Sequence, residues 1–252
     1  AGSERLMPTY VNTALRVVAN TTPVSSFTKE VTLNASAEMK DSTPSGGSGG
    51  WKRGLVGLKH FVITAKGMQD FAVGGIDEAF PATVLGTPDV ITCMPINDGT
   101  VVGEPAFLGN GREMGITPIM GKVGDIAGFS INWAGDGRLV GGKILHPSAR
   151  RTATGNGTAV AMVGPAASQS LYTAFHVTSV EGAGTITFTV QTDDASGFAS
   201  PTGRITSSAF AAAGAELKSV AGSFSSETHI RVIWTISGLT AATFEIAAGI
   251  AA

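Results

Sequence analysis

Residues 51–71 read WKRGLVGLKHFVITAKGMQDF. This stretch predicts a short loop that closes at Gly57, a strand over about Leu58–Lys66, and a turn at Gly67 ahead of Phe71. It contains no pattern of catalytic residues. Trp51 leads the chain back into a strand directly after a polar tract, and this composition is typical of a docking element.

A strand candidate and a glycine-rich tract precede this stretch. The candidate strand covers Phe27–Met39, and its apolar residues alternate with polar ones, so one dry face is expected to carry Val31, Leu33, Ala35 and Ala37. Residues 41–50 read DSTPSGGSGG, which is the composition of a flexible linker. We therefore expect an antiparallel pair of strands with a long, mobile connection.

The overall composition predicts a mainly β fold. The 252 residues include 34 glycines, 43% hydrophobic residues and 7% aromatic residues, which favours tight turns, short strands and a substantial core. Only 14% of the residues are charged, about half the usual share. Two explanations stay open: a sparse Ser/Thr/Gly surface, or a surface largely buried against other subunits. The net charge of −2 offers no basic footprint for nucleic acid.

The charge distribution predicts two domains. Residues 1–150 carry 13 Lys/Arg and 13 Asp/Glu, whereas residues 151–252 carry 4 and 6. The polar segment 146–158, HPSARRTATGNGT, is expected to link a first β domain (1–150) to a second β-sandwich-like domain (151–252). The pair Arg150-Arg151 within it is expected to be solvated.

Turn residues divide the chain into short strands. Hairpin turns are expected at Asn97-Asp98-Gly99 and Asn110-Gly111, and a further turn at Asp136-Gly137. A short helix capped by Asp77 is expected to extend to Phe80. Trp133 and Trp234 alternate in phase with aliphatic residues and are expected to lie in the core. The remaining expected strands are Val11–Ala19, Pro88–Met94, Val101–Leu108, Met114–Met120, Ile126–Trp133, Leu171–Val180, Thr185–Thr192, Thr206–Ala213, Leu217–Phe224, Thr228–Ser237 and Thr243–Ala248. The Ala-rich piece between Thr206–Ala213 and Leu217–Phe224 could instead be helical.

No combination of residues predicts an enzyme, a metal site or a cofactor site. His60, His146, His176 and His229 are widely spaced and are expected to be structural. Cys93 is the single cysteine, which excludes an intrachain disulfide. Asp193-Asp194 is expected to lie in a solvated loop, because a calcium site needs more oxygen ligands. No apolar run reaches about 18 residues, so no membrane span is expected, and the first residues do not predict a signal peptide.

Several segments resemble the major tail protein, or tail tube protein, of long-tailed bacteriophages. In the first part the resemblance is carried by the strand with NASAEMKDST, the Gly-rich loop, Trp51-Lys52, and GLVGLKHFVITAKGMQDF followed by residues 76–79, IDEA. In the second part it is carried by LYTAFHVTSV, FTVQTDDASGFASPTGRIT, HIRVIWTISG and the closing FEIAAGI. These motifs cover about four-fifths of the chain.

The resemblance implies a structural virion protein. Its fold would be a β-sandwich or barrel of the tail tube type with one short helix, followed by a C-terminal β-rich half. Such subunits form rings, usually hexameric, that stack into a hollow tube around a tape measure protein. The tube meets tail terminator and baseplate or tip proteins, and phage DNA passes through its lumen. Assembly would take place in the cytoplasm of the host bacterium.

The resemblance also implies a contact between rings through the long loop, about residues 41–57. The residues expected to make that contact are Asp41, Pro44, Trp51, Lys52, Arg53, Leu55 and Leu58. Residues 151–252 would form either an external decorating domain or a second tube-like half, in which case three subunits imitate a ring of six. Other functions that stay open are a head decoration protein, a head–tail joining protein and a carbohydrate-binding β-sandwich module.

Overall fold

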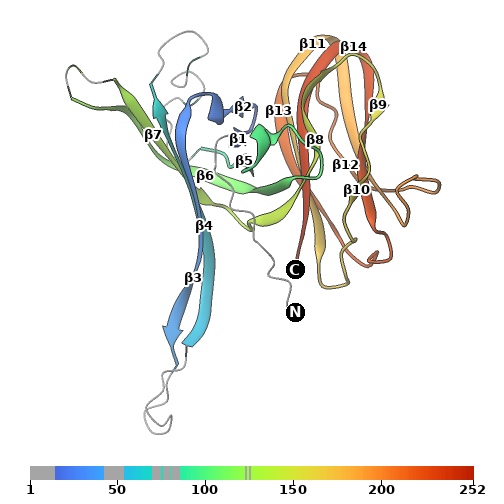
Figure 1. Ribbon diagram of the computed structural model, residues 1–252, viewed down its shortest axis with the longest axis horizontal. Helices are drawn as coiled ribbons and strands as arrows, with labels where there is room; N and C mark the ends of the chain where they lie inside the picture. Colours follow the sequence, from blue (N-terminus) through green and yellow to red (C-terminus); the bar gives the residue numbers. More distant parts are fainter. Residues whose placement is uncertain are drawn as a thin grey trace, which may run out of the picture.

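Antiparallel strands dominate the structure. It is a computed structural model, and it describes residues 15–42, 54–69, 75, 80, 86–122, 124 and 126–252. Fourteen strands of these residues belong to one hydrogen-bonded sheet (Figure 1). The helical residues among them form two 3₁₀ turns, η1 (Val24–Ser26) and η2 (Asn97–Gly99). The expected mainly β class is confirmed. The helix expected from Asp77 falls on residues outside the described ranges.

The strands are numbered in chain order. Their bounds are β1 Arg16–Ala19, β2 Thr22–Pro23, β3 Thr28–Asp41, β4 Gly54–Met68, β5 Asp89–Met94, β6 Pro105–Met120, β7 Gly128–Gly135, β8 Val140–Arg151, β9 Gly155–Asn156, β10 Val160–Ala161, β11 Ser170–Asp193, β12 Thr202–Thr206, β13 Gly214–Ala221 and β14 His229–Ala251. The main path through the sheet is β12-β11-β14-β8-β6-β5-β1-β2, and β7, β4 and β3 branch from β6 in that order.

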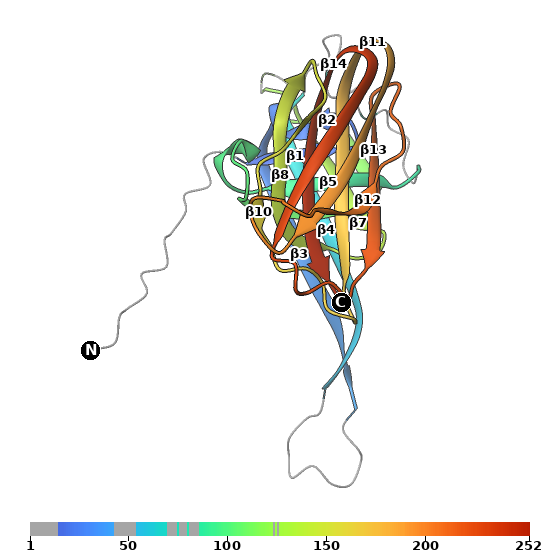
Figure 2. The same cartoon turned by 90° about the vertical axis from the view of Figure 1, so that its right-hand side faces the viewer.

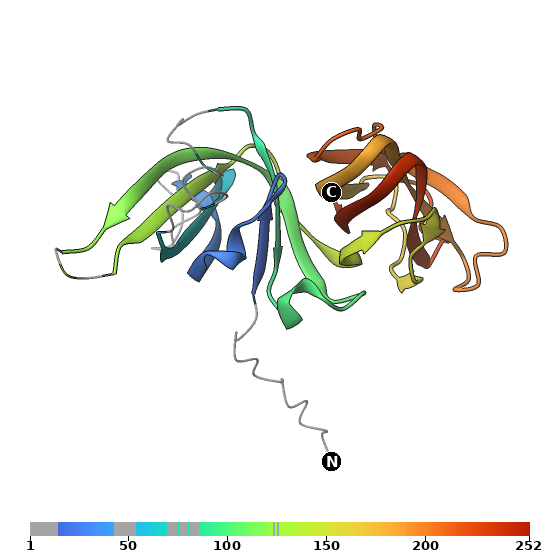
Figure 3. The ribbon, with the colours of Figure 1, turned by 90° about the horizontal axis from the view of Figure 1, so that it is seen from above.

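Two lobes lie side by side along this path (Figure 3). We call residues 15–139 the first lobe and residues 140–252 the second lobe. The first lobe packs Phe61, Phe129 and Trp133 around one core, and the second lobe packs Phe175, Phe188 and Phe244 around another. A third cluster, with members such as Val18, Leu108, Ile144 and Ala247, combines residues of both lobes.

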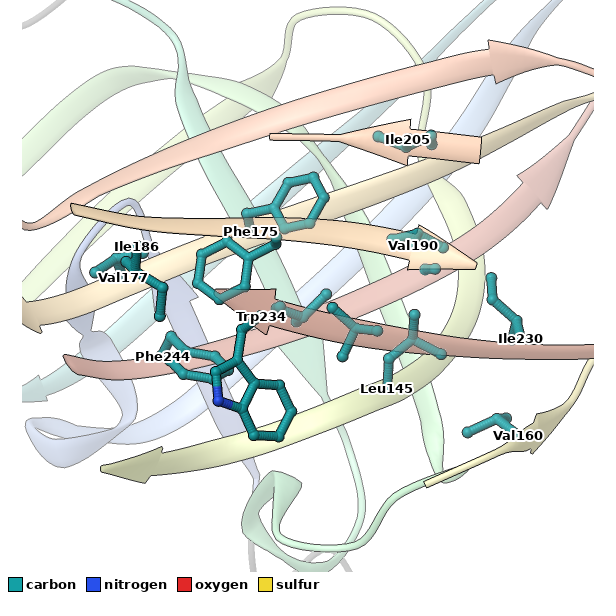
Figure 4. Packing of buried hydrophobic residues seen from close by; sticks show 14 of the residues in the cluster. Leu145, Val160, Phe175, Val177, Ile186, Val190, Ile205, Ile230, Trp234 and Phe244 are labelled. Atoms are coloured by element: carbon teal, nitrogen blue, oxygen red, sulfur yellow. The ribbon is translucent and has the colours of Figure 1, made fainter. Parts of the chain in front are cut away.

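The second lobe is built from two long strands that fold back on themselves. The rings of Phe175 and Phe188, both in β11, lie 5.7 Å apart, whereas thirteen residues of straight strand would separate them by about 43 Å. The fold-back falls where β11 and β14 change register, at residues 181–185 and 237–241. Gly182 and Gly238 adopt positive φ there, which glycine tolerates best. The core between the layers contains Phe175, Trp234 and Phe244 (Figure 4).

Two turn predictions are confirmed and two are wrong. η2 and the bend at Asp136-Gly137 do occupy two of the expected turns. Asn110-Gly111 is not a turn but lies inside β6, and Gly67 is not a turn but lies inside β4. Both glycines serve close packing instead, because a Cβ on Gly111 would stand 2.8 Å from Ile91 Cδ1 and a Cβ on Gly67 would overlap the carbonyl of Phe27.

The expected linker 146–158 is also wrong in part. Residues 146–151 continue β8, and His146 is buried beside Trp234 and Phe244, with its ring 4.4 Å from that of Phe244. The apolar neighbours that favour a strand here come from β14, far away in sequence. The division of the chain near residue 150 therefore stays a prediction, without the polar loop that was expected to mark it.

The weaker strand predictions in the second lobe also need correction. Thr206–Ala213 is mostly irregular, with one isolated bridge from Phe210 to Ile186, and β13 begins at Gly214. The Ala-rich piece at residues 211–213 is not helical. Trp133 and Trp234 are both buried, as expected.

Candidate self-association surface

The ends of β3 and β4 project from the body of the first lobe as a two-stranded arm (Figures 1 and 2). We define the arm as residues 34–41 of β3 and 54–60 of β4. All β3 side chains from Asn34 to Asp41 are exposed to solvent. The arm therefore extends beyond the part of the hairpin that this chain covers.

The hairpin has one apolar face, and the chain covers only its inner half. Val31 and Leu33 are half-buried and pair with the buried residues Ala65 and Ile63. Further out the pairs are Ala35–Phe61 and Ala37–Lys59, followed by a register shift before Met39. Ala35 and Ala37 are exposed, so the dry face expected from alternation is dry at Val31 and Leu33 but not at its last two residues.

Large apolar side chains gather toward the outer end of the arm. Met39 is 73% exposed, Leu55 63% and Leu58 79%. Met39 pairs with Val56 and Leu55 pairs with Lys40, so Met39 and Leu55 lie on opposite faces of the arm. Both faces of the outer arm therefore expose large apolar side chains, and exposed apolar surface of this kind is typical of interaction sites. Met39 continues the alternation of Val31, Leu33, Ala35 and Ala37 in β3. It was nevertheless not among the residues that the sequence analysis expected at the contact between rings.

The expected contact residues fall partly on this arm. Asp41 ends β3 and pairs with Gly54, and Leu55 pairs with Lys40 one step further in. Leu58 lies in β4 near the register shift. Pro44, Trp51, Lys52 and Arg53 lie outside the described residues. The expected loop 41–57 is shorter than predicted, because β3 includes Asp41 and β4 already begins at Gly54.

The outer edges of the subsheet formed by β3, β4, β7 and β6 have no further strand partner among the described residues. β3 pairs only with β4. β6 pairs with β8 and β5 up to Gly111, and beyond Gly111 it pairs only with β7. The subsheet β3-β4-β7-β6 thus presents two open edges, along β3 and along residues 112–120 of β6. Open edges of this length are templates for pairing with another chain.

Charges on this subsheet are mostly paired. Lys66 Nζ lies 3.3 Å from Glu30 Oε1, and Arg112 Nε donates to Asp136 Oδ2 at 3.0 Å. The face opposite the apolar one carries small polar groups, such as Thr64, which donates to Asn132 Oδ1 at 2.8 Å. Exposed pairs of this kind contribute little to stability, and they leave the surface almost neutral.

A groove of about 900 Å³ lies at the base of the arm. Its lining includes Ala37 and Phe61 from the hairpin, Arg138 and Leu139 from the turn before β8, and the backbone end of β14 at Ala251. Lys59 and His60 also line it, and no acidic side chain is among the described residues that do so.

His146 and His176 are buried in structural surroundings, whereas His60 is exposed. The His176 ring is fully buried and bridges Thr92 Oγ1 at 2.8 Å and the Asn20 carbonyl at 2.7 Å. Burial lowers the pKa of His176 and, helped by the charge of Arg151, lowers the pKa of His146 to about 4. Cys93 is buried, which raises the pKa of its thiol to about 12.

Asp194 is exposed in its loop, as expected, but Asp193 is not solvated. It is buried, and its two carboxylate oxygens accept from the backbone N–H groups of Ala195 and Ser200, at 3.2 and 3.0 Å. The carboxylate organises the loop between β11 and β12. Across the described ranges no group of His, Cys, Asp and Glu residues is close enough to hold a metal ion, and no described helix is long and apolar enough to span a bilayer.

The structure does not present Trp234 as a stacking surface for a sugar. Its side chain is buried, Nε1 donates to the Ala153 carbonyl at 2.9 Å, and Gly155 lies against the ring so closely that a Cβ there would be 2.8 Å from it. A shallow hollow over this ring is lined by polar residues such as Gln191, whose side chain accepts from Arg231.

No family model matches the chain, and neither does any curated protein. Among solved structures, the chain is similar to a component of the virion of a native gene transfer agent particle, at 16% identity and a TM-score of 0.38 over 52% of this chain and 97% of that one. It is also similar to a component of the tail of an empty gene transfer agent particle with C6 symmetry, at 18% identity and 0.36 over 50% and 92%. The Dit hub protein of phage SPP1 is 14% identical, with a TM-score of 0.36 over 95% and 100%. All three TM-scores lie below 0.5.

Proposed function

We propose that this chain is a structural protein of a phage tail whose copies join into rings, and that the rings stack into a hollow tube. The observation that carries the proposal is the arm, because the chain itself leaves its large apolar side chains Met39, Leu55 and Leu58 exposed. The arm and the two open edges leave apolar side chains without cover and strand edges without partners, and contact with other copies would supply both.

The arm has an energetic reason to associate. Full burial of one Leu or Met side chain stabilises a complex by about 1.5–3 kcal/mol, and Met39, Leu55 and Leu58 are all largely exposed. The ordering of the surrounding chain offsets part of this gain. Before that cost, full burial of all three would contribute about 4.5–9 kcal/mol, which favours contact with a copy in the next ring. Trp51 lies close to them in sequence.

The open edges support ring closure by strand pairing. Neighbouring strands in the order β3-β4-β7-β6 are antiparallel, so β3 and β6 run in opposite directions. A rotation about an axis along the strands brings residues 112–120 of β6 in one copy beside β3 of the next, again antiparallel. Each copy would then add four strands to a continuous barrel, which leaves no edge exposed. Six copies, or three if the second lobe supplies a tube-like half, would complete the ring.

The wider role follows from the tube. The tube would surround a tape measure protein, end at terminator and baseplate or tip proteins, and let phage DNA pass without binding it. The nearly neutral polar face of the subsheet suits such a passage, since a basic lining would bind phosphates and slow the DNA. No catalytic step or cofactor is part of this proposal, and the tail of the virion is its location.

Negative-stain electron microscopy of the purified protein tests the proposal. Hollow tubes or stacked rings at high protein concentration are the expected result, and the rotational symmetry of end views gives the number of copies. Dispersed monomers that also fail to polymerise on added tail-tip complexes would overturn it. In that event a head decoration or head–tail joining role, or sugar binding tested on a glycan array, becomes the better explanation.

A further inference from the structure

The groove at the base of the arm has a charge that its own chain does not balance. Lys59 and Arg138 have no ion pair within the described residues, and the lining includes His60 but no acidic side chain. A carboxylate at Ala252 would balance only one of these two cations, so one positive charge would remain. Phe61, Ala37 and Leu139 provide an apolar floor. A complementary occupant therefore needs an apolar group flanked by carboxylates.

One exposed segment of the same chain has this composition. Residues 97–104 read NDGTVVGE, with Asp98 and Glu104 on either side of Val101 and no basic residue. Asp98 is exposed, Glu104 is half-buried, and Val101 is 44% exposed. We call this segment the acidic turn.

The acidic turn is held in shape before any contact. Thr100 Oγ1 donates to the Asn97 carbonyl at 2.6 Å, and Gly103 N donates to the Ile144 carbonyl at 2.8 Å. Val102 packs against the core of the second lobe. Because the turn is already ordered, little conformational entropy is lost when it binds. Asp98 already interacts electrostatically with Arg16 of its own chain, and this interaction helps to raise the pKa of Arg16. We therefore expect Glu104 to contribute more than Asp98 to a contact with a second copy.

We propose that the acidic turn of one copy docks in the groove of a second copy, with Val101 on the apolar floor and Asp98 and Glu104 facing Arg138 and Lys59. Figure 2 shows the green segment around residue 100 at the side of the molecule, away from the C-terminus that marks one wall of the groove. The contact is therefore head-to-tail and joins different copies. It deepens the proposed self-assembly and rests on it.

The arm of a second copy fits the groove less well. Its outer end has Glu38 and Asp41 but also Lys40, and Lys52 and Arg53 follow closely in sequence. The sum is positive, like the groove itself. Charge complementarity thus favours the acidic turn as the occupant.

Disulfide trapping between two variants that each carry one introduced cysteine tests this contact directly. Ala37→Cys in one chain and Val101→Cys in another are mixed at high concentration and oxidised. The proteins are then denatured in the presence of N-ethylmaleimide, which blocks free thiols, including the buried Cys93 as it becomes exposed. A cross-linked dimer, identified by mass spectrometry, is expected. Ala37→Cys mixed with Val163→Cys is the control, since Val163 is 60% exposed but lies outside the acidic turn. Equal yields from both mixtures, or none from the first, would overturn the inference.

Charge exchange then tests the reason for the contact. Lys59→Glu with Arg138→Glu on the Ala37→Cys chain is expected to lower the yield by roughly tenfold, because like charges would meet. Adding Asp98→Lys with Glu104→Lys on the Val101→Cys chain is expected to restore it. Circular dichroism checks that each variant folds. A yield that the first exchange leaves unchanged would contradict the inference.

The two proposals fail differently. Normal tubes from the chain that carries Lys59→Glu and Arg138→Glu would overturn the docking contact and leave the tail tube proposal intact. A specific cross-link without any ring or tube, even with tail-tip complexes present, would support the contact and count against the tube.

Discussion

At the scale of single residues, glycines in the first lobe show where backbones approach too closely for a side chain. Gly135 pairs with Gly111, and a Cβ on Gly135 would overlap the ring of Phe61, which is itself buried. Gly115, on the same strand pair, has no atom within 4 Å of its Cβ position. Two glycines a few residues apart in the sheet are thus under opposite constraints.

We expect Gly135→Ala to lower the free energy of unfolding by about 1–3 kcal/mol, because the overpacked ring must move. Gly115→Ala should leave stability unchanged or raise it by up to about 1 kcal/mol, since alanine restricts the unfolded chain. Urea unfolding of both variants measures the difference. Similar midpoints would show that Phe61 has room to shift.

His146 carries the clearest pH dependence. Its folded pKa of about 4 lies below the ordinary value of 6.5, so the unfolded chain binds a proton more readily than the folded one. The neutral ring contributes its full stability above pH 6.5, and that stability is lost as the pH falls from 6.5 toward 4. The shift amounts to about 3 kcal/mol at most.

Replacing His146 with Phe should flatten the stability curve in this range. Phe keeps an aromatic ring beside Phe244 and loses the acceptor for Arg151 Nε, which lies 3.1 Å away. Urea unfolding of both proteins at pH 7, 5.5 and 4.5 makes the comparison, and His176 contributes equally to both curves. Parallel curves would rule out His146 as a source of acid sensitivity.

At the scale of elements, local patterns predicted strands well and their ends poorly. The strand pair β3–β4 and the buried face with Trp133 could be predicted from alternation, because period-2 burial leaves a period-2 sequence. The turn prediction at Asn110-Gly111 is wrong because glycine is also needed inside a strand where a neighbouring side chain leaves no room for a Cβ, as Ile91 does at Gly111. The exposure of the arm could not be predicted. Alternation indicates which face of a strand is buried, but not whether the same chain or another molecule buries it.

The arm allows a clean separation of folding from assembly. Leu58→Asp and Met39→Asp change side chains that are mostly exposed in the single chain, so the free energy of unfolding should change by less than about 0.5 kcal/mol. The same variants should lose ring stacking, because the charge would be buried at the contact. Val163→Asp, at another exposed apolar position, serves as the control. Electron microscopy measures tube formation by the three variants, and urea unfolding measures their stability. Normal tubes from Leu58→Asp would contradict the role of the arm.

At the scale of the whole molecule, β1 ties the two lobes together. Arg16 donates from Nε and Nη2 to the two carboxylate oxygens of Glu245 in β14, at 2.7 and 3.1 Å, and Glu245 is buried. Asn20, directly after β1, accepts from His176 of β11 through its carbonyl and donates to Asp89 through Nδ2. A segment of five residues therefore contacts both lobes with polar groups that need their partners.

Arg16→Met tests how much of the joint depends on the ion pair. Loss of the guanidinium leaves the buried carboxylate of Glu245 without its partner, which should cost about 3–5 kcal/mol. The double variant with Glu245→Met should recover part of this cost, because two apolar side chains remain. The free energies of unfolding of the four proteins in this cycle give the coupling.

Single-tryptophan proteins show whether the lobes then separate. With Trp51 changed to Phe, Trp133 reports on the first lobe and Trp234 on the second, each in a chain where the other is also Phe. In otherwise unchanged chains both fluorescence transitions should share one urea midpoint, because the cluster around Val18 and Ile144 and the ion pair join the lobes. With Arg16→Met the two midpoints should differ. Coincident midpoints in that variant would mean that apolar packing alone joins the lobes, and that the boundary near residue 150 separates no independent folding units.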